Sequence, residues 1–167
     1  MNIRKLTELA LLTALALILF IVELRLPDLT PIPGVKLGLA NIITVYAVFR
    51  FQPHETAMLV TARVLLGAAF SANPAALLYS ALGAALCLAG MLGVRHFIPC
   101  KWIWAASILG AVLHNTGQIL AAVLIMRTTA VLGYFPVLLF SGCLAGLFTG
   151  LCAQLILHRF DRHGTNM

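Results

Sequence analysis

Long apolar stretches alternate with short polar breaks along the chain, and this pattern is the main structural signal in the sequence. A helix needs about 20 residues, at about 1.5 Å each, to span a bilayer, and somewhat shorter helices are tolerated. The breaks carry residues that end helices, such as Pro27, Pro53 and Pro74. The pattern therefore predicts six transmembrane helices, over residues 7–24, 37–51, 56–72, 76–94, 103–125 and 134–157.

Composition indicates the same class of protein. Of the 167 residues, 62% are hydrophobic and only 10% are charged, which is typical of integral membrane proteins. The length allows one helical domain, residues 1–167, and no separate soluble domain. The net charge of +6 comes from Lys and Arg residues scattered singly at the ends of apolar stretches. Such residues set membrane topology, so we expect no nucleic-acid partner.

The same cationic residues predict the orientation in the membrane. Counted on alternate sides of the six helices, one side carries Arg4, Lys5, Arg50, Arg95, Lys101, Arg159 and Arg162, and the other Arg25, Lys36 and Arg127. The positive-inside rule then places both termini in the cytoplasm of a multi-pass plasma-membrane protein. No cleavage site of the A-x-A type follows the first apolar stretch, so we expect it to remain as a transmembrane helix.

Arg63 stands near the middle of an apolar stretch, at residues 55–70. A guanidinium in hydrocarbon is unfavourable unless it meets a water-filled cavity, a polar partner or an anionic ligand. We expect no Asp or Glu at a comparable depth to neutralise it, although Glu23 could reach Arg63 or Arg25 from the outer rim. We therefore interpret Arg63 as the centre of function.

Further polar residues are predicted in the outer half of the bilayer. At about 1.5 Å per residue, Asn41 lies about 6 Å and Arg63 about 13 Å below the outer boundary, while His114 lies near the midplane. The predicted site opens to the outside and contains Asn41, Arg63, Tyr79, Ser80, His114, Asn115 and Gln118, with Lys36 at its mouth.

The chemistry of this predicted site leaves two interpretations open. His114, Asn115 and Gln118 have the spacing of one polar helix edge, and their side chains suit a ligand with a hydrogen-bonding body. Arg63 adds a fixed charge and a fork of donors for a carboxylate or phosphate. Alternatively, these residues bond to one another and to backbone carbonyls and simply hold helices together.

Small residues recur at four-residue intervals on the first and last predicted helices. They comprise Ala10 and Ala14 near the N-terminus, and Gly142, Gly146 and Gly150 near the C-terminus. Small side chains on one face allow two helices to approach closely. The glycine series is interpreted mainly as packing inside this chain, with a contact to another subunit as the alternative.

Several of these motifs together resemble a known family. They are the string from Pro33 to Ile42, Arg63, the Leu77-Leu78-Tyr79-Ser80 string and His114-Asn115-x-x-Gln118. The chain resembles, over nearly its whole length, the family named both Gx transporter and heptaprenyl diphosphate synthase component I. That family is similar to the S-components of energy-coupling factor (ECF) transporters, which bind a ligand from outside. The resemblance implies a six-helix bundle whose Ala10-x-x-x-Ala14 pattern docks on a coupling subunit.

Enzymatic activity does not fit the residues that are present. Prenyl chain elongation uses clustered aspartates that hold divalent metal on a diphosphate, whereas this chain has only Asp28 and Asp161, predicted at opposite faces. A phosphate-binding G-x-x-x-x-G-K-[ST] motif is absent, so ATP-driven uptake would need separate ATPases. The four cysteines lack paired spacing, and we expect no metal, disulfide or cofactor.

Three functional hypotheses follow from the sequence. The first is a substrate-binding component of an ECF-like importer that captures a small polar or anionic ligand from outside. The second is a nonenzymatic accessory membrane subunit that handles an isoprenoid diphosphate, a quinone precursor or a flavin. The third is a passive helical scaffold. The sequence does not identify the ligand.

Overall fold

Helices make up nearly all of the part of the chain that the structure, a computed structural model, describes, namely residues 3–25, 38–71 and 74–164. Two short 3-10 helices, η1 (Cys100–Trp102) and η2 (Ala130–Tyr134), flank the fifth helix. The six α-helices are α1 (Ile3–Arg25), α2 (Asn41–Arg50), α3 (Pro53–Ser71), α4 (Pro74–Val94), α5 (Ile103–Met126) and α6 (Phe135–Gly164).

The predicted all-α class is confirmed, and the helices follow the apolar stretches of the sequence. Helices α1, α4, α5 and α6 are long and apolar enough to cross a membrane. Helix α2 differs from the prediction, because it starts at Asn41 and has only 10 residues. At about 1.5 Å per residue it extends about 15 Å, so the prediction of a spanning helix over 37–51 is wrong in length.

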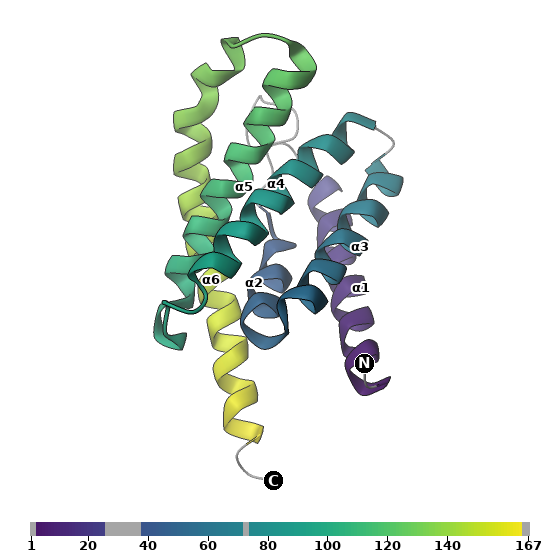
Figure 1. The fold of residues 1–167 in the computed structure, drawn as a ribbon, viewed down its shortest axis with the longest axis vertical. Coiled ribbons are helices and arrows are strands. Elements are labelled where there is room, and N and C mark those ends of the chain that lie inside the picture. Colours follow the sequence, from purple (N-terminus) through teal and green to yellow (C-terminus); the bar gives the residue numbers. More distant parts are fainter. Residues whose placement is uncertain (1–2, 26–37, 72–73, 165–167) are drawn as a thin grey trace.

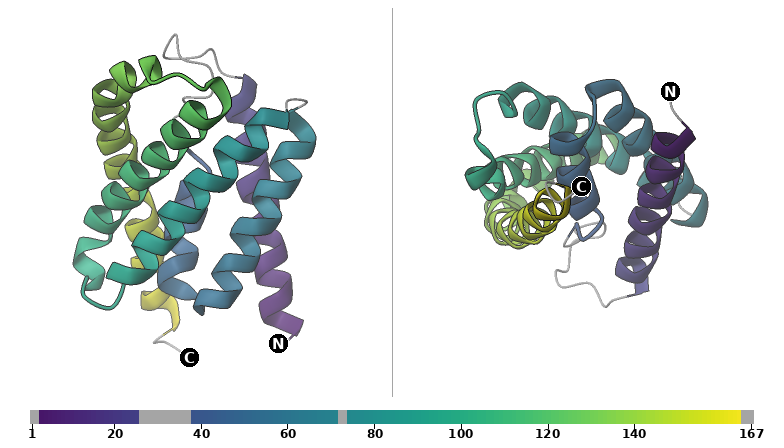
Figure 2. Two further views of the ribbon diagram at one scale, coloured as in Figure 1. Left: turned by 45° about the horizontal axis from the view of Figure 1, so that its top comes forward. Right: turned by 90° about the horizontal axis from the view of Figure 1, so that it is seen from below.

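Five helices form a curved layer around the short α2. Along this layer α1 packs on α3, α3 on α4, α4 on α5, and α5 on α6. Figure 1 shows α2 between the α4–α5–α6 group and the α1–α3 pair, and Figure 2 shows the same arrangement from two further sides. Helix α2 contacts all five of the other helices and lies at the centre of the bundle.

The core forms around α2 because most side chains in the middle of this helix are apolar and buried. A short helix that is hydrophobic all round must be buried, and Val45, Ala47 and Val48 of α2 are almost fully buried. They belong to one apolar cluster that includes Leu59 of α3 and Met91 of α4. In contrast, large apolar side chains of α1 and α6 are exposed on the outside of the layer, as expected for surfaces that face lipid.

Glycines allow α6 to pack closely against α5. A Cβ atom at Gly146 would lie 2.7 Å from the Cα atom of Ile108, and one at Gly150 would lie 2.6 Å from the Cα atom of Trp104. A side chain at either position would therefore push the two backbones apart. This confirms that the GxxxGxxxG pattern serves packing within the chain.

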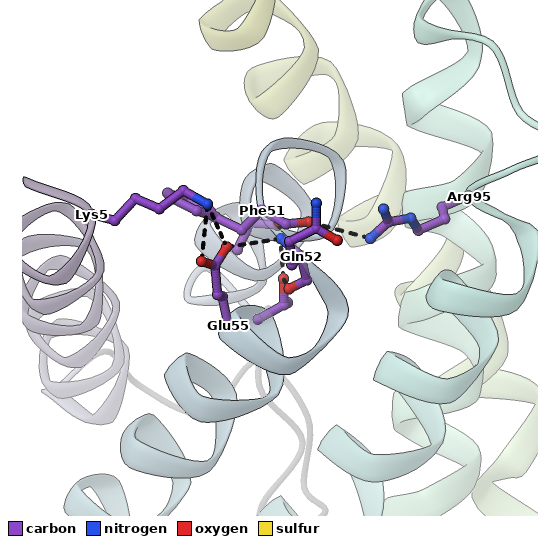
Figure 3. A network of polar contacts seen from close by, with 7 residues as sticks. Lys5, Phe51, Gln52, Glu55 and Arg95 are labelled. Carbon is purple, nitrogen blue, oxygen red and sulfur yellow. Dashed lines mark hydrogen bonds and ion pairs between the residues drawn. The ribbon is translucent and has the colours of Figure 1, made fainter. Parts of the chain in front are cut away.

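A polar network joins the ends of helices near the α2–α3 turn (Figure 3). The Nζ atom of Lys5 in α1 lies 3.0 Å from Oε1 of Glu55 in α3. The other carboxylate oxygen of Glu55 accepts the backbone N–H of Gln52 at 3.0 Å. Glu55 is the third residue of α3, and its side chain accepts the backbone N–H of the N-cap residue Gln52, as the glutamate of a capping box does. Pro53 is the first residue of the helix, a position that proline favours.

Arg95, the residue that follows α4, completes this network. Its Nη1 donates to the backbone carbonyls of Val48 and Phe51, at 3.3 Å each. The last carbonyls of a helix have no partner within the helix, so a cation that bonds them stabilises the end of α2. The inner ends of α1, α2, α3 and α4, on the predicted cytoplasmic side, are thereby fixed to one another.

We predict that the contribution of Glu55 to stability depends on pH. The backbone N–H of Gln52 and then the Lys5 ammonium lower the pKa of Glu55 below its usual value of 4.5. Because the folded-state pKa is the lower one, the stabilisation is present at neutral pH and is lost as the pH falls through that pKa. Glu55→Gln should therefore unfold at a lower temperature than the parent at neutral pH, and the difference should shrink in acid.

Thermal unfolding in detergent across a pH series measures this effect. Glu8→Gln is the matched control, since the structure describes no hydrogen bond or ion pair for Glu8 and the variant should behave like the parent. A deficit of Glu55→Gln that stays constant from neutral to acidic pH would contradict the assignment.

Candidate functional site

The guanidinium of Arg63 lies inside the bundle with few polar partners. Its residue is only 7% exposed, and its Nη1 donates to Oδ1 of Asn41 at 3.3 Å. Within the described part of the chain, this is the one hydrogen bond that Arg63 makes. A guanidinium has five N–H donors, so most of its donors have no acceptor among the residues that the structure describes. A buried charge in this condition is energetically unfavourable unless something else binds to it.

Asn41 reaches Arg63 because a tight turn precedes α2. Gly38 has a φ of 74°, a left-handed conformation that glycine adopts without strain. The carbonyl of Gly38 accepts the backbone N–H of Asn41 at 2.8 Å. A Cβ atom at Gly38 would lie 2.9 Å from Nδ2 of Asn41, so the absence of a side chain also leaves room for the Asn41 amide.

Glu23 approaches the same place from the end of α1. It is 5% exposed, and its carboxylate accepts the backbone N–H groups of Gly38 and Leu39, the latter at 3.2 Å. Its negative charge also acts on Arg63 electrostatically. Glu23 thus influences Arg63 from the end of α1, as the sequence allowed, while the expectation about membrane depth stays a prediction. The position of Glu23 in an apolar stretch is itself a signal in the sequence, because an ionisable residue within an apolar helix is a functional candidate by default.

His114 approaches Arg63 from α5. Its Nδ1 atom is buried without a hydrogen bond of good geometry, beside the backbone of Gly83 in α4. Arg63 is close enough to His114 and to Cys87 of α4 to interact with both electrostatically. The sequence allowed for an approach of Glu23 to Arg63, but it did not predict the backbone contacts of Glu23 or the electrostatic influence of Arg63 on Cys87. We refer to Glu23, Asn41, Arg63 and His114 as the polar cluster.

Asn115 lies apart from the polar cluster. Its Nδ2 donates to the carbonyl of Leu138 in α6 at 2.7 Å, and its side chain is buried between α5 and α6. Adjacent helical residues point about 100° apart, so His114 faces α4 while Asn115 faces α6. The predicted polar edge of α5 is therefore split: His114 lies beside α4, and Asn115 is bonded to α6. The half-buried Gln118 makes no described hydrogen bond.

The remaining predicted site residues are less closely connected to Arg63. Tyr79 and Ser80 are half-buried on α4, and the structure describes no hydrogen bond from either one to Arg63. Lys36 falls outside the described residues. Ala10 and Ala14 are exposed on α1, away from the core.

The polar cluster brings several hydrogen-bonding groups together inside the bundle. Among the residues the structure describes, no group of three or more His, Cys, Asp or Glu side chains is placed to hold a metal ion. Instead, unpaired guanidinium donors, an amide and an imidazole nitrogen come together inside the bundle. Such groups form directed hydrogen bonds with an anionic or polar ligand.

Comparison with solved structures identifies the fold of this chain. A solved structure of the S component of a bacterial ECF transporter matches with a TM-score of 0.61 over 98% of this chain and 96% of that one, at 19% sequence identity. This likeness establishes the fold of the chain as that of an S component. The fold and the apolar helices together define a multi-pass membrane protein.

The sequence comparison then gives the family. Residues 12–156 match the model of the family described as heptaprenyl diphosphate synthase component I, and the chain belongs to that family. The resemblance noted from the motifs is confirmed in both respects. No curated protein matches the sequence.

We predict that Asn115 contributes to stability and not to ligand retention. Asn115→Ala removes the bond to Leu138 and leaves a buried carbonyl without that donor, so the free energy of unfolding should fall by about 1 kcal/mol. Gln118→Ala, which removes no described hydrogen bond, should have a smaller effect on unfolding in detergent. The assignment fails if Asn115→Ala is as stable as the parent but no longer retains the small molecule with which the parent copurifies.

Proposed function

We propose that this protein is the substrate-binding membrane component of an ECF-like importer, and that it captures a small polar or anionic ligand from the outer side. The fold of an S component supports this assignment, since the matched structure belongs to an ECF transporter. The polar cluster supplies the chemistry that a binding component requires.

The observation that carries the proposal is the state of Arg63. Its guanidinium is buried, has one described hydrogen bond and keeps several donors for another acceptor. A carboxylate or phosphate oxygen would satisfy two of these donors at once, in the bidentate geometry that guanidinium favours. The imidazole of His114, which packs beside Gly83 of α4, would border a polar part of the same ligand.

Energy for transport would come from partner subunits. The chain has no phosphate-binding ATPase motif, so ATP hydrolysis requires separate proteins. Ala10 and Ala14 are exposed on α1 beside the exposed side chains of Leu11, Leu15 and Ile18. A surface of small and apolar residues allows another transmembrane helix to pack closely. We propose this face of α1 as the docking surface for a coupling subunit.

The transport cycle then follows from the location of the polar cluster. With both termini in the cytoplasm, ligand would enter between the outer ends of α1 and α2 and bind Arg63 and Asn41. Partner subunits would reorient the bundle, and the ligand would leave on the inner side. Exposure of one site to alternate sides is the physical requirement of any such transporter.

A second candidate is favoured by the family description, which names a component of heptaprenyl diphosphate synthase. On this alternative the protein is a nonenzymatic membrane subunit that handles an isoprenoid diphosphate, a quinone precursor or a flavin. The polar cluster lacks the clustered aspartates of the usual prenyl elongation site, so catalysis would belong to a partner. Copurification with a soluble prenyl synthase would favour this alternative, and copurification with ATPases would favour the importer.

Arg63→Ala should weaken ligand binding most among single substitutions in the cluster. A charge-assisted hydrogen bond contributes about 1.5–3 kcal/mol, and a bidentate contact makes two. Arg63→Lys keeps the charge but loses the planar fork, so it should recover only part of the affinity. Mass spectrometry of the small molecule retained through gentle purification gives the occupancy of each variant.

Gln118→Ala is the control for this series, because it removes a neutral group whose hydrogen bond would contribute about 0.5–1.5 kcal/mol. Unchanged occupancy in a stably folded Arg63→Ala protein would refute Arg63 as an anion-binding residue.

Replacing Ala10 or Ala14 with Leu should prevent assembly with the coupling subunit and leave ligand occupancy intact. Both residues are exposed, so a larger side chain fits the isolated bundle but separates the helices of a docked pair. Ala16 is 0% exposed on the same helix, and Ala16→Leu should instead destabilise the bundle itself. Loss of folding in the Ala10 or Ala14 variant, or normal assembly, would contradict the docking surface.

A further inference from the structure

Glu23 places a buried carboxylate at the N-terminal end of α2. The backbone N–H groups that precede a helix have no acceptors within it, and the helix dipole favours negative charge at this end. Glu23 accepts two of these groups, from Gly38 and Leu39, although it belongs to α1. The contact therefore fixes the start of α2 against the end of α1.

The position of Asn41 follows from this contact. Gly38 and Leu39 accept the backbone N–H groups of Asn41 and Ile42, at 2.8 and 3.1 Å, to form the turn that opens α2. Asn41 is the first helical residue, and its amide oxygen accepts the hydrogen bond from Arg63. A continuous series of hydrogen bonds thus leads from Glu23 through the turn to the guanidinium.

Charge balance gives Glu23 a second effect on the same group. Both residues are buried, and the carboxylate of Glu23 attracts Arg63 across the polar cluster. An uncompensated charge inside a protein is unfavourable, so one opposite charge within range stabilises the other. Glu23 therefore helps to stabilise the Arg63 charge before a ligand binds.

We propose that Glu23 is the positioning residue of the polar cluster: it holds the start of α2 so that Asn41 meets Arg63, and it balances the Arg63 charge while the site is empty. The term "site" here rests on the proposed function, but the two physical effects do not require a known ligand. They are therefore tested on the protein without ligand.

The charge effect is tested by a double-mutant cycle with the variants Glu23→Gln, Arg63→Gln and the combination of both. Thermal unfolding in detergent, with ligand removed, gives the stability of each protein. Glu23→Gln should unfold at a lower temperature than the parent, because it leaves the buried Arg63 charge less compensated. Glu23→Gln should lower the unfolding temperature less in the Arg63→Gln background than in the parent, because no Arg63 charge then remains to be compensated. A purely structural hydrogen bond from Glu23 would not be compensated by removing the Arg63 charge.

The cycle of Glu55→Gln with Arg63→Gln is the matched control. Glu55 is bonded to Lys5 and Gln52 near the inner helix ends, so its loss should add independently to the loss of Arg63. Additive losses in the Glu23 cycle as well would overturn the charge-balancing role.

The positioning effect is tested by hydrogen exchange of backbone amides. In Glu23→Ala, the amides of Gly38 and Leu39 should exchange faster, while the amide of Gln52 should stay as in the parent. In Glu55→Ala the pattern should reverse, since Glu55 accepts the Gln52 amide. Unchanged exchange at Gly38 and Leu39 in Glu23→Ala would overturn the positioning role.

Failure of either test leaves the ligand assignment of Arg63 standing, because neither one measures ligand. Conversely, loss of that assignment would leave both effects of Glu23 measurable.

Discussion

Burial of the Arg63 charge is the constraint on which the polar interior of this protein depends. A guanidinium enclosed by apolar helices must find compensation from its surroundings, and the described residues supply only part of it. Asn41 accepts one hydrogen bond and Glu23 contributes an opposite charge. We propose that the remaining donors of Arg63 serve a ligand, which would distinguish a binding site from a contact that only holds helices together.

The short helix α2 supplies part of this compensation, because its first residue, Asn41, accepts a hydrogen bond from Arg63. Because α2 has only 10 residues, its N-terminal end lies within the bundle, with Ala40 3% exposed just before it. Irregular backbone among membrane helices is tolerated where protein surrounds it and satisfies its polar groups. Glu23 satisfies two N–H groups there, and the same turn presents Asn41 to Arg63. At the other end of α2, Arg95 and Glu55 hold the turn into α3.

Features that depend on local pattern were predictable from the sequence. Hydropathy gave the positions of the long helices, and the spacing of Gly142, Gly146 and Gly150 gave the close packing of α6, because both are properties of one segment. Features that depend on the rotation of a helix about its axis, or on contacts between residues far apart in the sequence, were not predictable. Spacing alone grouped Asn115 with His114, whereas the packing of α6 turned Asn115 away. Glu23 meets Gly38 across 15 residues, a contact that hydropathy does not encode.

Direct observation of the guanidinium of Arg63 in protein purified with its native small molecule tests the central claim. We predict that a high-resolution structure shows that molecule with acceptor atoms at about 2.7–2.9 Å from the nitrogens of Arg63, as in charge-assisted hydrogen bonds. A structure in which protein groups alone satisfy every Arg63 donor, with the retained molecule bound elsewhere, would contradict the account.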